Sequence, residues 1–161
     1  MTDLDVAAIV NAANETLLGG GGVDGAIHRT AGPKLLEECR TLGGCATGDA
    51  KITGGYDLKA KYVIHTVGPV WVDGNSGEAE LLESCYRTCF ELTDQYDITS
   101  IAFPAISTGA FSYPLEEATR IAIGTTWLAL EANESIRKVV FACFDKESYE
   151  CYDRLLQELV R

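Results

Sequence analysis

The chain has 161 residues, of which 47% are hydrophobic, 9% aromatic and 23% charged, and its formal net charge is −11 at pH 7. This length and apolar content predict one folded domain over residues 1–161 and exclude a disordered chain. Acidic side chains outnumber basic ones in both halves of the sequence, so we expect neither a nucleic-acid groove nor a surface for anionic membranes. The sequence has no secretory signal and no apolar run near the roughly 20 residues of a membrane-spanning helix, so we expect a cytoplasmic protein.

Strands and helices are predicted to alternate along the chain. Short apolar runs predict strands, and periodic apolar positions predict helices; the strands are 6–10, 49–53, 62–66, 99–104 and 138–144, and the helices are 23–31, 33–40, 78–96, 115–132 and 146–160. This order predicts an α/β fold with helices on both faces of a mostly parallel sheet. Inside helix 115–132, Gly124 costs about 1 kcal/mol relative to Ala, so we expect it to mark close packing.

The cysteines and histidines do not predict a metal site. The six cysteines form no CxxC pair, and His28 and His65 fall in none of the familiar zinc-ligand spacings, so we expect reduced thiols in the core or at the surface. His28 lies one helical turn beyond Asp24, which allows a role as a base, but a packed or surface histidine is favoured. His65 in strand 62–66 is expected to be a core histidine with satisfied hydrogen bonds.

The first candidate site follows the first predicted strand. Residues 11–25 have the sequence NAANETLLGGGGVDG, in which four consecutive glycines precede the start of a helix. The glycines allow the backbone to approach a ligand closely, and the helix N-terminus offers free N–H groups at the positive end of its dipole. This combination predicts a site for an anionic group, most often a phosphate, with Asn14 and Asp24 beside it.

A second loop of similar character, 105–114 (AISTGAFSYP), follows strand 99–104. Ligands of α/β sheets bind at the carboxyl ends of strands, so we expect the two loops to meet at one crevice. Residues 20–25 also match the dinucleotide pattern G-x-G-x-x-G, but nine residues separate Val10 from Gly20, and positions 43–45 lack the acidic residue of that fingerprint. An NAD-dependent oxidoreductase is therefore a disfavoured alternative, and a P-loop NTPase is excluded because its motif is absent from the sequence.

Four motifs, VNAAN, GGGGVDGAIH, HTVGP and PAISTGAFSYP, occur in this order, and together they resemble the macrodomain family. Within that family they are most similar to the MacroD type, which contains O-acetyl-ADP-ribose deacetylases and mono-ADP-ribosyl hydrolases. The resemblance extends from Ala8 to the last predicted helix. It implies a three-layer α/β/α fold around a mixed sheet, with a cleft for ADP-ribose at the strand ends.

The resemblance also implies roles for individual residues. Asn14 matches the family's asparagine at the distal ribose, and Asp24 matches the aspartate that catalytic members need. Gly22 and Val23 match positions whose backbone contacts the diphosphate and the distal ribose. The second loop matches the family's other diphosphate loop, with an aromatic ring against the ribose at its end; the matching residues are Ser107, Thr108, Gly109, Ala110 and Phe111.

The sequence departs from the family at its start. The family normally has one or more strands and a Gly-Asp-Ile-Thr stretch, whose Asp-Ile pair contacts adenine, whereas this chain starts at Met1 immediately after that point. Three explanations are open: a start further upstream, a shortened chain, or a protein without the adenine contact. From this departure we expect a fold without the N-terminal strand, weaker adenine discrimination, and a dimer partner or neighbouring segment over the sheet edge.

From these observations we expect a hydrolase that binds ADP-ribose derivatives and cleaves an ester at the distal ribose, with Asn14 and Asp24 as catalytic residues. Water is the expected nucleophile, and no metal or other cofactor is required. Candidate substrates are O-acetyl-ADP-ribose and proteins that carry mono-ADP-ribose on Asp or Glu side chains. The alternative is a reader module that binds ADP-ribose without turnover, and the presence of both Asn14 and Asp24 favours the enzyme.

Overall fold

A mixed five-stranded sheet forms the middle layer of the protein, whose computed structural model describes residues 1–159. Its strands are β1 (Ala8–Ala12), β2 (Ala50–Gly54), β3 (Tyr62–Thr66), β4 (Ser100–Phe103) and β5 (Lys138–Phe141). They lie in the order β2-β3-β1-β4-β5, and every neighbouring pair is parallel except β2 with β3. The prediction of a mostly parallel sheet is therefore confirmed.

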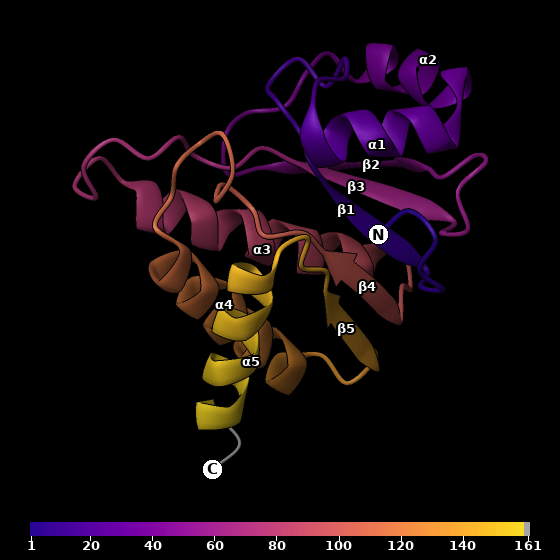
Figure 1. The fold of residues 1–161 in the computed structure, drawn as a ribbon. Coiled ribbons are helices and arrows are strands. Elements are labelled where there is room, and N and C mark those ends of the chain that lie inside the picture. Colours follow the sequence, from indigo (N-terminus) through magenta and orange to yellow (C-terminus); the bar gives the residue numbers. More distant parts are fainter. Residues whose placement is uncertain (160–161) are drawn as a thin grey trace.

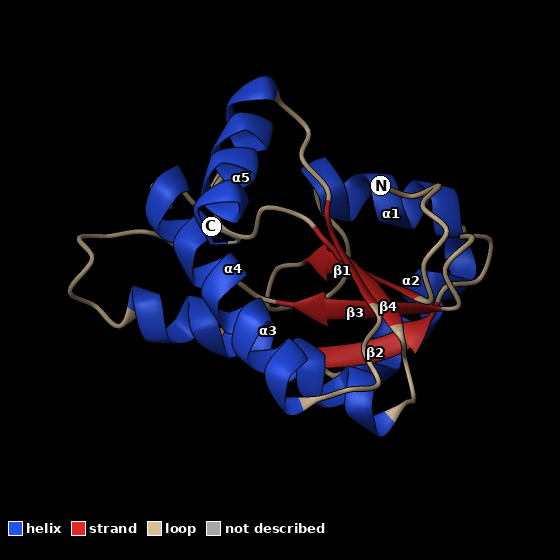
Figure 2. Ribbon diagram, turned by 90° about the horizontal axis from the view of Figure 1, so that it is seen from below, coloured by secondary structure: helices blue, strands red, loops and turns tan. Residues whose placement is uncertain are grey.

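Helices cover both faces of this sheet. They are α1 (Gly22–Ala31), α2 (Pro33–Leu42), α3 (Glu78–Gln95), α4 (Leu115–Ala132) and α5 (Lys146–Leu159). Helices α1 and α2 lie on one face, and α3, α4 and α5 lie on the other (Figures 1 and 2). This arrangement confirms the predicted three-layer α/β/α fold. Among residues 1–159, no helix combines the length and the apolar content that crossing a membrane requires.

The central strands are buried on both faces because each face has its own apolar core. In β1, Ala8 and Val10 pack into the core beneath α3, α4 and α5, whereas Ile9 packs into the core beneath α1 and α2. Phe103 of β4 anchors the larger core, and its ring lies 5.0 Å from that of Tyr86, measured between centroids. The loops that leave these strands therefore start from a rigid base.

The sequence predicted all ten elements, but some of their bounds differ. Strand β1 extends to Ala12, so Asn11 lies inside the sheet and is fully buried. Strand β5 ends at Phe141, so Phe144 belongs to the following loop. Residue 160, the last of the predicted helix 146–160, lies outside the described residues.

The prediction that Gly124 marks close packing in α4 is wrong. Gly124 is exposed, and a Cβ added there would meet no other atom of residues 1–159 within 4 Å. It lies two positions from the buried Ala122, and therefore on the opposite side of the helix. The cysteines do follow the prediction, since all six are free thiols and all but Cys143 are buried.

Candidate functional site

The carboxyl ends of β1, β4 and β5 open into one cleft of about 1070 Å³. The two loops that the sequence predicted to meet both line it. All the predicted site residues lie along its walls: Asn14, Gly22, Val23, Asp24, Ser107, Thr108, Gly109, Ala110 and Phe111. The cleft forms here because neighbouring parallel strands end at the same edge of the sheet and their loops then diverge.

Asn14 is held by its own loop. Its Oδ1 accepts hydrogen bonds from Thr16 Oγ1 at 2.6 Å and from the backbone N–H of Leu17 at 3.2 Å, and its Nδ2 donates to the Gly19 carbonyl at 3.0 Å. These contacts close the β1–α1 loop into a compact turn. Asn14 is therefore oriented before any ligand arrives.

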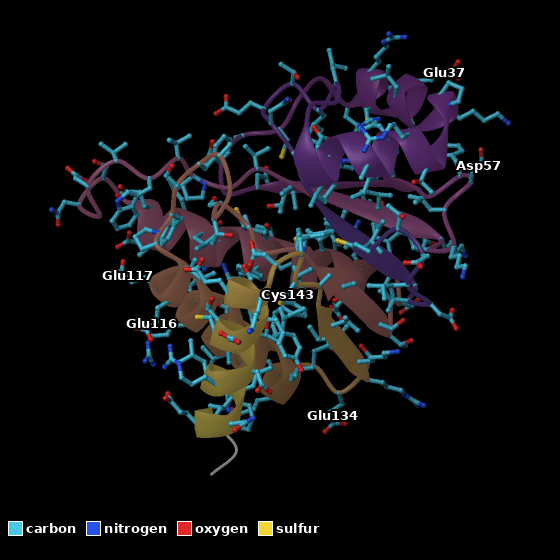
Figure 3. All side chains as sticks on the ribbon, in the orientation of Figure 1. Glu37, Asp57, Glu116, Glu117, Glu134 and Cys143 are labelled. Carbon is cyan, nitrogen blue, oxygen red and sulfur yellow. The ribbon has the colours of Figure 1, made fainter. Side chains whose placement is uncertain are left out.

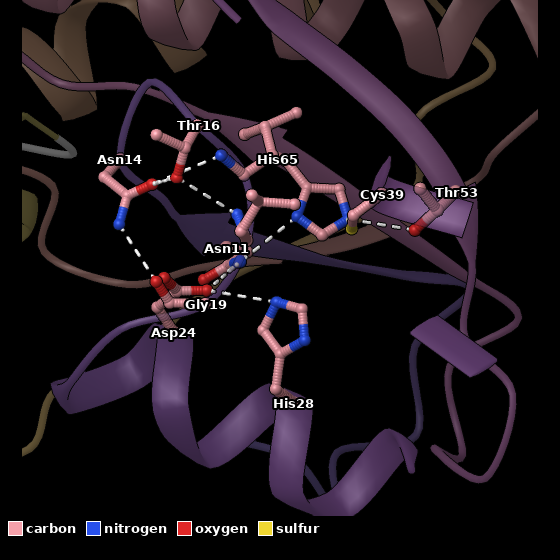
Figure 4. A network of polar contacts seen from close by, with 11 residues as sticks. Asn11, Asn14, Thr16, Gly19, Asp24, His28, Cys39, Thr53 and His65 are labelled. Atoms are coloured by element: carbon pink, nitrogen blue, oxygen red, sulfur yellow. Dashed lines mark hydrogen bonds and ion pairs between the residues drawn. The ribbon is translucent and has the colours of Figure 1, made fainter. Parts of the chain in front are cut away.

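Asp24 lies in the first turn of α1, where a negative charge is favoured by the helix dipole. Its side chain is almost fully buried, and its Oδ1 accepts a hydrogen bond from Asn11 Nδ2 at 2.8 Å. His28 Nε2 lies 3.4 Å from the same oxygen. Residues on the side away from the cleft thus hold Oδ1 of the Asp24 carboxylate (Figure 4).

Gly20 lies beside both the second carboxylate oxygen of Asp24 and the side-chain amide of Asn14. A Cβ added at Gly20 would lie 3.1 Å from Asp24 Oδ2 and 3.4 Å from Asn14 Nδ2. Any larger residue would therefore crowd both polar groups. The glycine leaves the approach to the carboxylate and the amide open.

The polar network behind Asp24 was missed by the sequence analysis. Asn11 also contacts His65, with 3.1 Å between Asn11 Nδ2 and His65 Nδ1, and His65 Nε2 lies 2.9 Å from Thr53 Oγ1 and 3.8 Å from Cys39 Sγ. The prediction that His65 is a satisfied core histidine is confirmed, but its link to Asp24 was not foreseen. The available signal was an asparagine and a histidine interrupting two otherwise apolar strands.

The β4–α4 loop forms the opposite side of the cleft with strained backbone. Ser107 and Ser112 have φ angles of +67° and +62°, which non-glycine residues rarely adopt. The Oγ of Ser107 is buried, lines the cleft, and has no hydrogen-bond partner among residues 1–159. An unpaired buried hydroxyl in a strained loop indicates a polar ligand site.

The cleft offers amide groups instead of positive side chains. Among the described residues that line it there is no Lys, Arg or His, and its charged residues are Asp24, Asp145 and Glu147. The N-terminus of α1, which begins at Gly22, has no side-chain cap, so its first N–H groups are free for an anion. A phosphate here would be held by backbone donors and hydroxyls.

The β5–α5 loop forms a third wall of the cleft, which was not predicted from the sequence. Phe144, Asp145, Glu147 and Ser148 line the cleft, and the Phe144 side chain is 63% exposed. Asp145 begins the helix by accepting a hydrogen bond from the Ser148 N–H at 2.7 Å, and this bond holds the pKa of the carboxyl below its usual value. The available signal was the position of this loop after another parallel strand.

Sequence comparisons relate this chain to known proteins. The profile of the Macro domain family matches residues 10–122. A macro domain-containing protein of Chlorobaculum tepidum is 60% identical over 156 residues, which cover 97% of this chain and 91% of that protein. A protein of Pantoea vagans named O-acetyl-ADP-ribose deacetylase 1 is 49% identical over 160 residues, which cover 97% of this chain and 94% of that protein.

Solved structures show the same architecture. A mutant macrodomain from Oceanobacillus iheyensis, solved with ADPR, is similar with a TM-score of 0.94 and 41% identity, covering 99% of this chain and 89% of that one. The macrodomain of Trypanosoma brucei in complex with ADP-ribose is similar with a TM-score of 0.91 and 49% identity, covering 96% of this chain and 65% of that one.

Proposed function

This chain belongs to the macro domain family, and on that premise we propose that it binds ADP-ribose derivatives and hydrolyses an ester at their distal ribose. The substrates are O-acetyl-ADP-ribose, proteins with mono-ADP-ribose on Asp or Glu side chains, or both. The observation that carries the proposal is the position of Asp24, whose Oδ1 is fixed by Asn11 while Oδ2 lies beside the gap at Gly20. A carboxylate held in this way is prepared to act on a group that enters the cleft.

The walls of the cleft suit each part of ADP-ribose. The free N–H groups at the start of α1 and the Ser107 hydroxyl provide donors for a diphosphate without a basic residue. Asn14 offers both an acceptor and a donor, which suits a ribose diol. At the far end, the exposed ring of Phe144 offers a face on which a purine can stack. The distal ribose then lies against Asn14 and Asp24.

In this mechanism Asp24 is the general base. It takes a proton from a water molecule, the water oxygen attacks the acyl carbon, and the ribose oxygen leaves and takes up the proton. The products are ADP-ribose and acetate, or ADP-ribose and the free carboxyl side chain of a protein. A positioned general base contributes typically about 10²–10⁴-fold to the rate.

The test compares Asp24→Asn with the wild type by release of acetate from O-acetyl-ADP-ribose. We expect kcat to fall by about 10²–10⁴-fold, because the amide cannot take the proton. The matched control is Asp153→Asn, which changes an exposed carboxylate on α5 that accepts a hydrogen bond from Gln157 Nε2 at 3.1 Å. Titration calorimetry with ADP-ribose shows whether each variant still has a binding site.

Two results would contradict the proposal. Equal acetate release by Asp24→Asn and the wild type would remove Asp24 from the mechanism. Tight binding of ADP-ribose by a wild type that releases neither acetate nor ADP-ribose from either class of substrate would instead assign the chain as a reader of ADP-ribose.

A further inference from the structure

We propose that His65 is a positioning residue that acts through Asn11 to hold Asp24 in the orientation needed for hydrolysis. The inference deepens the proposed function and rests on it. His65 lies behind the cleft, fully buried, and does not line it. His65 can therefore influence the reaction only through Asn11, whose side chain contacts both His65 and Asp24 (Figure 4).

The register of two strands brings the three side chains together. Strand β1 pairs in parallel with β3, and Asn11 lies directly beside His65 in that register. The Nδ2 atom of Asn11 is 3.1 Å from His65 Nδ1 and 2.8 Å from Asp24 Oδ1. The two N–H groups of one amide can therefore serve both partners at once.

The direction of each hydrogen bond follows from the far end of the network. The Thr53 hydroxyl donates to the Gly54 carbonyl at 3.1 Å, so its oxygen accepts from the ring nitrogen of His65 that lies 2.9 Å away. Burial, and secondarily electrostatic repulsion from the neighbouring His28, lower the pKa of His65 to about 3, so the ring is neutral and has one N–H. That hydrogen is on Nε2, and Nδ1 is left as an acceptor.

An acceptor at Nδ1 determines which way the Asn11 amide faces. With Nδ2 towards His65, Asn11 also presents a donor to Asp24. Rotated by half a turn, the amide would place its carbonyl oxygen against the carboxylate, and the two acceptors would repel each other. The histidine therefore decides whether Asp24 meets a donor or an acceptor.

The orientation of the Asn11 amide lowers stability, and this cost supports the role assigned to His65. Asn11 Oδ1 is buried and has no hydrogen-bond partner among residues 1–159. A buried unpaired acceptor is destabilising, and an apolar side chain at this position would avoid it. An amide at this position is explained if its donor edge is needed by His65 and Asp24.

The His65→Asn and His65→Gln variants test the roles of the two ring nitrogens one at a time. The Asn oxygen is one bond beyond Cγ, as Nδ1 is, so His65→Asn keeps an acceptor for Asn11 and loses the donor to Thr53. The Gln amide nitrogen is two bonds beyond Cγ, as Nε2 is, so His65→Gln keeps the donor to Thr53 and loses the acceptor. Both variants are smaller or more flexible than histidine, so both are expected to lower the melting temperature.

In His65→Gln the Asn11 amide is no longer held, and its hydrogen bond to the charged Asp24 is lost. We therefore expect kcat for acetate release to fall about tenfold or more in His65→Gln, and to stay within a few-fold of the wild type in His65→Asn. The KM and the Kd for ADP-ribose should change little in either variant. Equal kcat in both variants and the wild type would overturn the inference. Parallel loss of kcat and ADP-ribose affinity in both variants would also overturn it, because that pattern indicates a role in stability alone.

A measurement on the wild type tests the same geometry if the variants do not fold. In protein labelled with ¹⁵N in histidine, the nitrogen chemical shifts of His65 should show a neutral ring with hydrogen on Nε2 at pH 6 to 8. Hydrogen on Nδ1, or a charged ring, would overturn the inference. If the wild type releases neither acetate nor ADP-ribose from either class of substrate, the proposed function fails first and the role of His65 falls with it. Normal turnover with an unaffected His65→Gln variant removes only the role of His65.

Discussion

The two main walls of the cleft use their polar groups in different ways. In the first wall, residues 13–24, the side chains of Asp24 and Asn14 are already held by hydrogen bonds with other groups of the protein. In the second wall, residues 104–114, the buried Ser107 hydroxyl has no partner within residues 1–159. The side chains of the first wall are therefore presented in a fixed orientation, whereas the Ser107 side chain of the second wall keeps its hydrogen-bonding capacity for a ligand.

The second wall takes its shape from packing with neighbouring segments. Gly68, just beyond β3, lies so close to Ser107 and Ile106 that an added Cβ would collide with both. Trp71 donates its backbone N–H to the Phe111 carbonyl at 2.8 Å, and its ring lies 4.8 Å from that of Tyr113. Changes that release the Asp24 side chain of the first wall should therefore alter turnover, and changes in the packing around the second wall should alter affinity.

Among the variants that test the difference between the two walls, Asn11→Ala is expected to have the largest effect. This variant removes the donor to Asp24 and leaves His65 Nδ1 unpaired, so kcat should fall about 100-fold, the equivalent of two lost hydrogen-bonding interactions. The Kd for ADP-ribose should remain within a few-fold of the wild type. Steady-state kinetics with O-acetyl-ADP-ribose and calorimetry with ADP-ribose measure the two quantities. Weaker binding of ADP-ribose with a normal kcat would show that the network behind Asp24 serves binding and not turnover.

The second-largest effect is expected from Gly68→Ala. The added methyl group forces Ser107 and the second wall outwards, so the affinity for ADP-ribose should fall about tenfold, in line with typical costs of overpacking. At saturating substrate, kcat should stay within a few-fold of the wild type. If Gly68→Ala lowers kcat while the Kd is unchanged, the second wall takes part in the reaction itself.

A smaller, pH-dependent effect is expected from Glu78→Gln. The buried Glu78 carboxylate accepts hydrogen bonds from four backbone N–H groups of the loop that contains Trp71; the donors are Val72, Asp73, Gly74 and Ser76. The bonds from Gly74 and its neighbours lower the pKa of Glu78 to about 2 from an ordinary 4.5. The carboxylate therefore stabilises the fold fully above pH 4.5, and this contribution is lost as the pH falls towards 2.

Denaturant unfolding at several pH values measures this contribution. The wild type should be more stable than Glu78→Gln at pH 7, and the difference should shrink steadily below pH 4.5. The control is Glu80→Gln, in the same helical turn, where the side chain is exposed. A constant difference between pH 7 and pH 3 would show that the charge of Glu78 is not what holds the loop.

The smallest effect is expected from Gly124→Ala, which lies far from both walls on the exposed side of α4. The new methyl group meets nothing in the described chain, so the substitution should raise the free energy of unfolding by about 0.5–1 kcal/mol through helix propensity. Both kcat and the Kd for ADP-ribose should be unchanged. This variant also serves as the control for Gly68→Ala, and a loss of stability would mean that Gly124 packs against a second molecule.

Local patterns were sufficient to predict the elements and the two glycine-containing loops, since strand and helix periodicities and glycine content are properties of short segments. The role of Asn11 was not predictable in this way, because it depends on the register between β1 and β3 and on the orientation of Thr53. Phe144 was not predicted as a loop residue because it belongs to the apolar run 138–144, which reads as one strand. In the structure β4 ends before Pro104, which has no N–H, and the pairing of β5 with β4 therefore ends at Phe141. Periodicity likewise could not show which side of α4 would face α5.

The amide-lined cleft has a consequence for the kinetics of ligand capture. Acidic side chains such as Glu37, Asp57, Glu116, Glu117 and Glu134 lie on the outer surface of several parts of the molecule (Figure 3), and the net charge is −11. An anionic ligand is therefore repelled on approach and retained only on contact with the backbone donors. Added salt should accelerate its association, opposite to a lysine or arginine clamp, and polyanions should compete poorly for the same cleft.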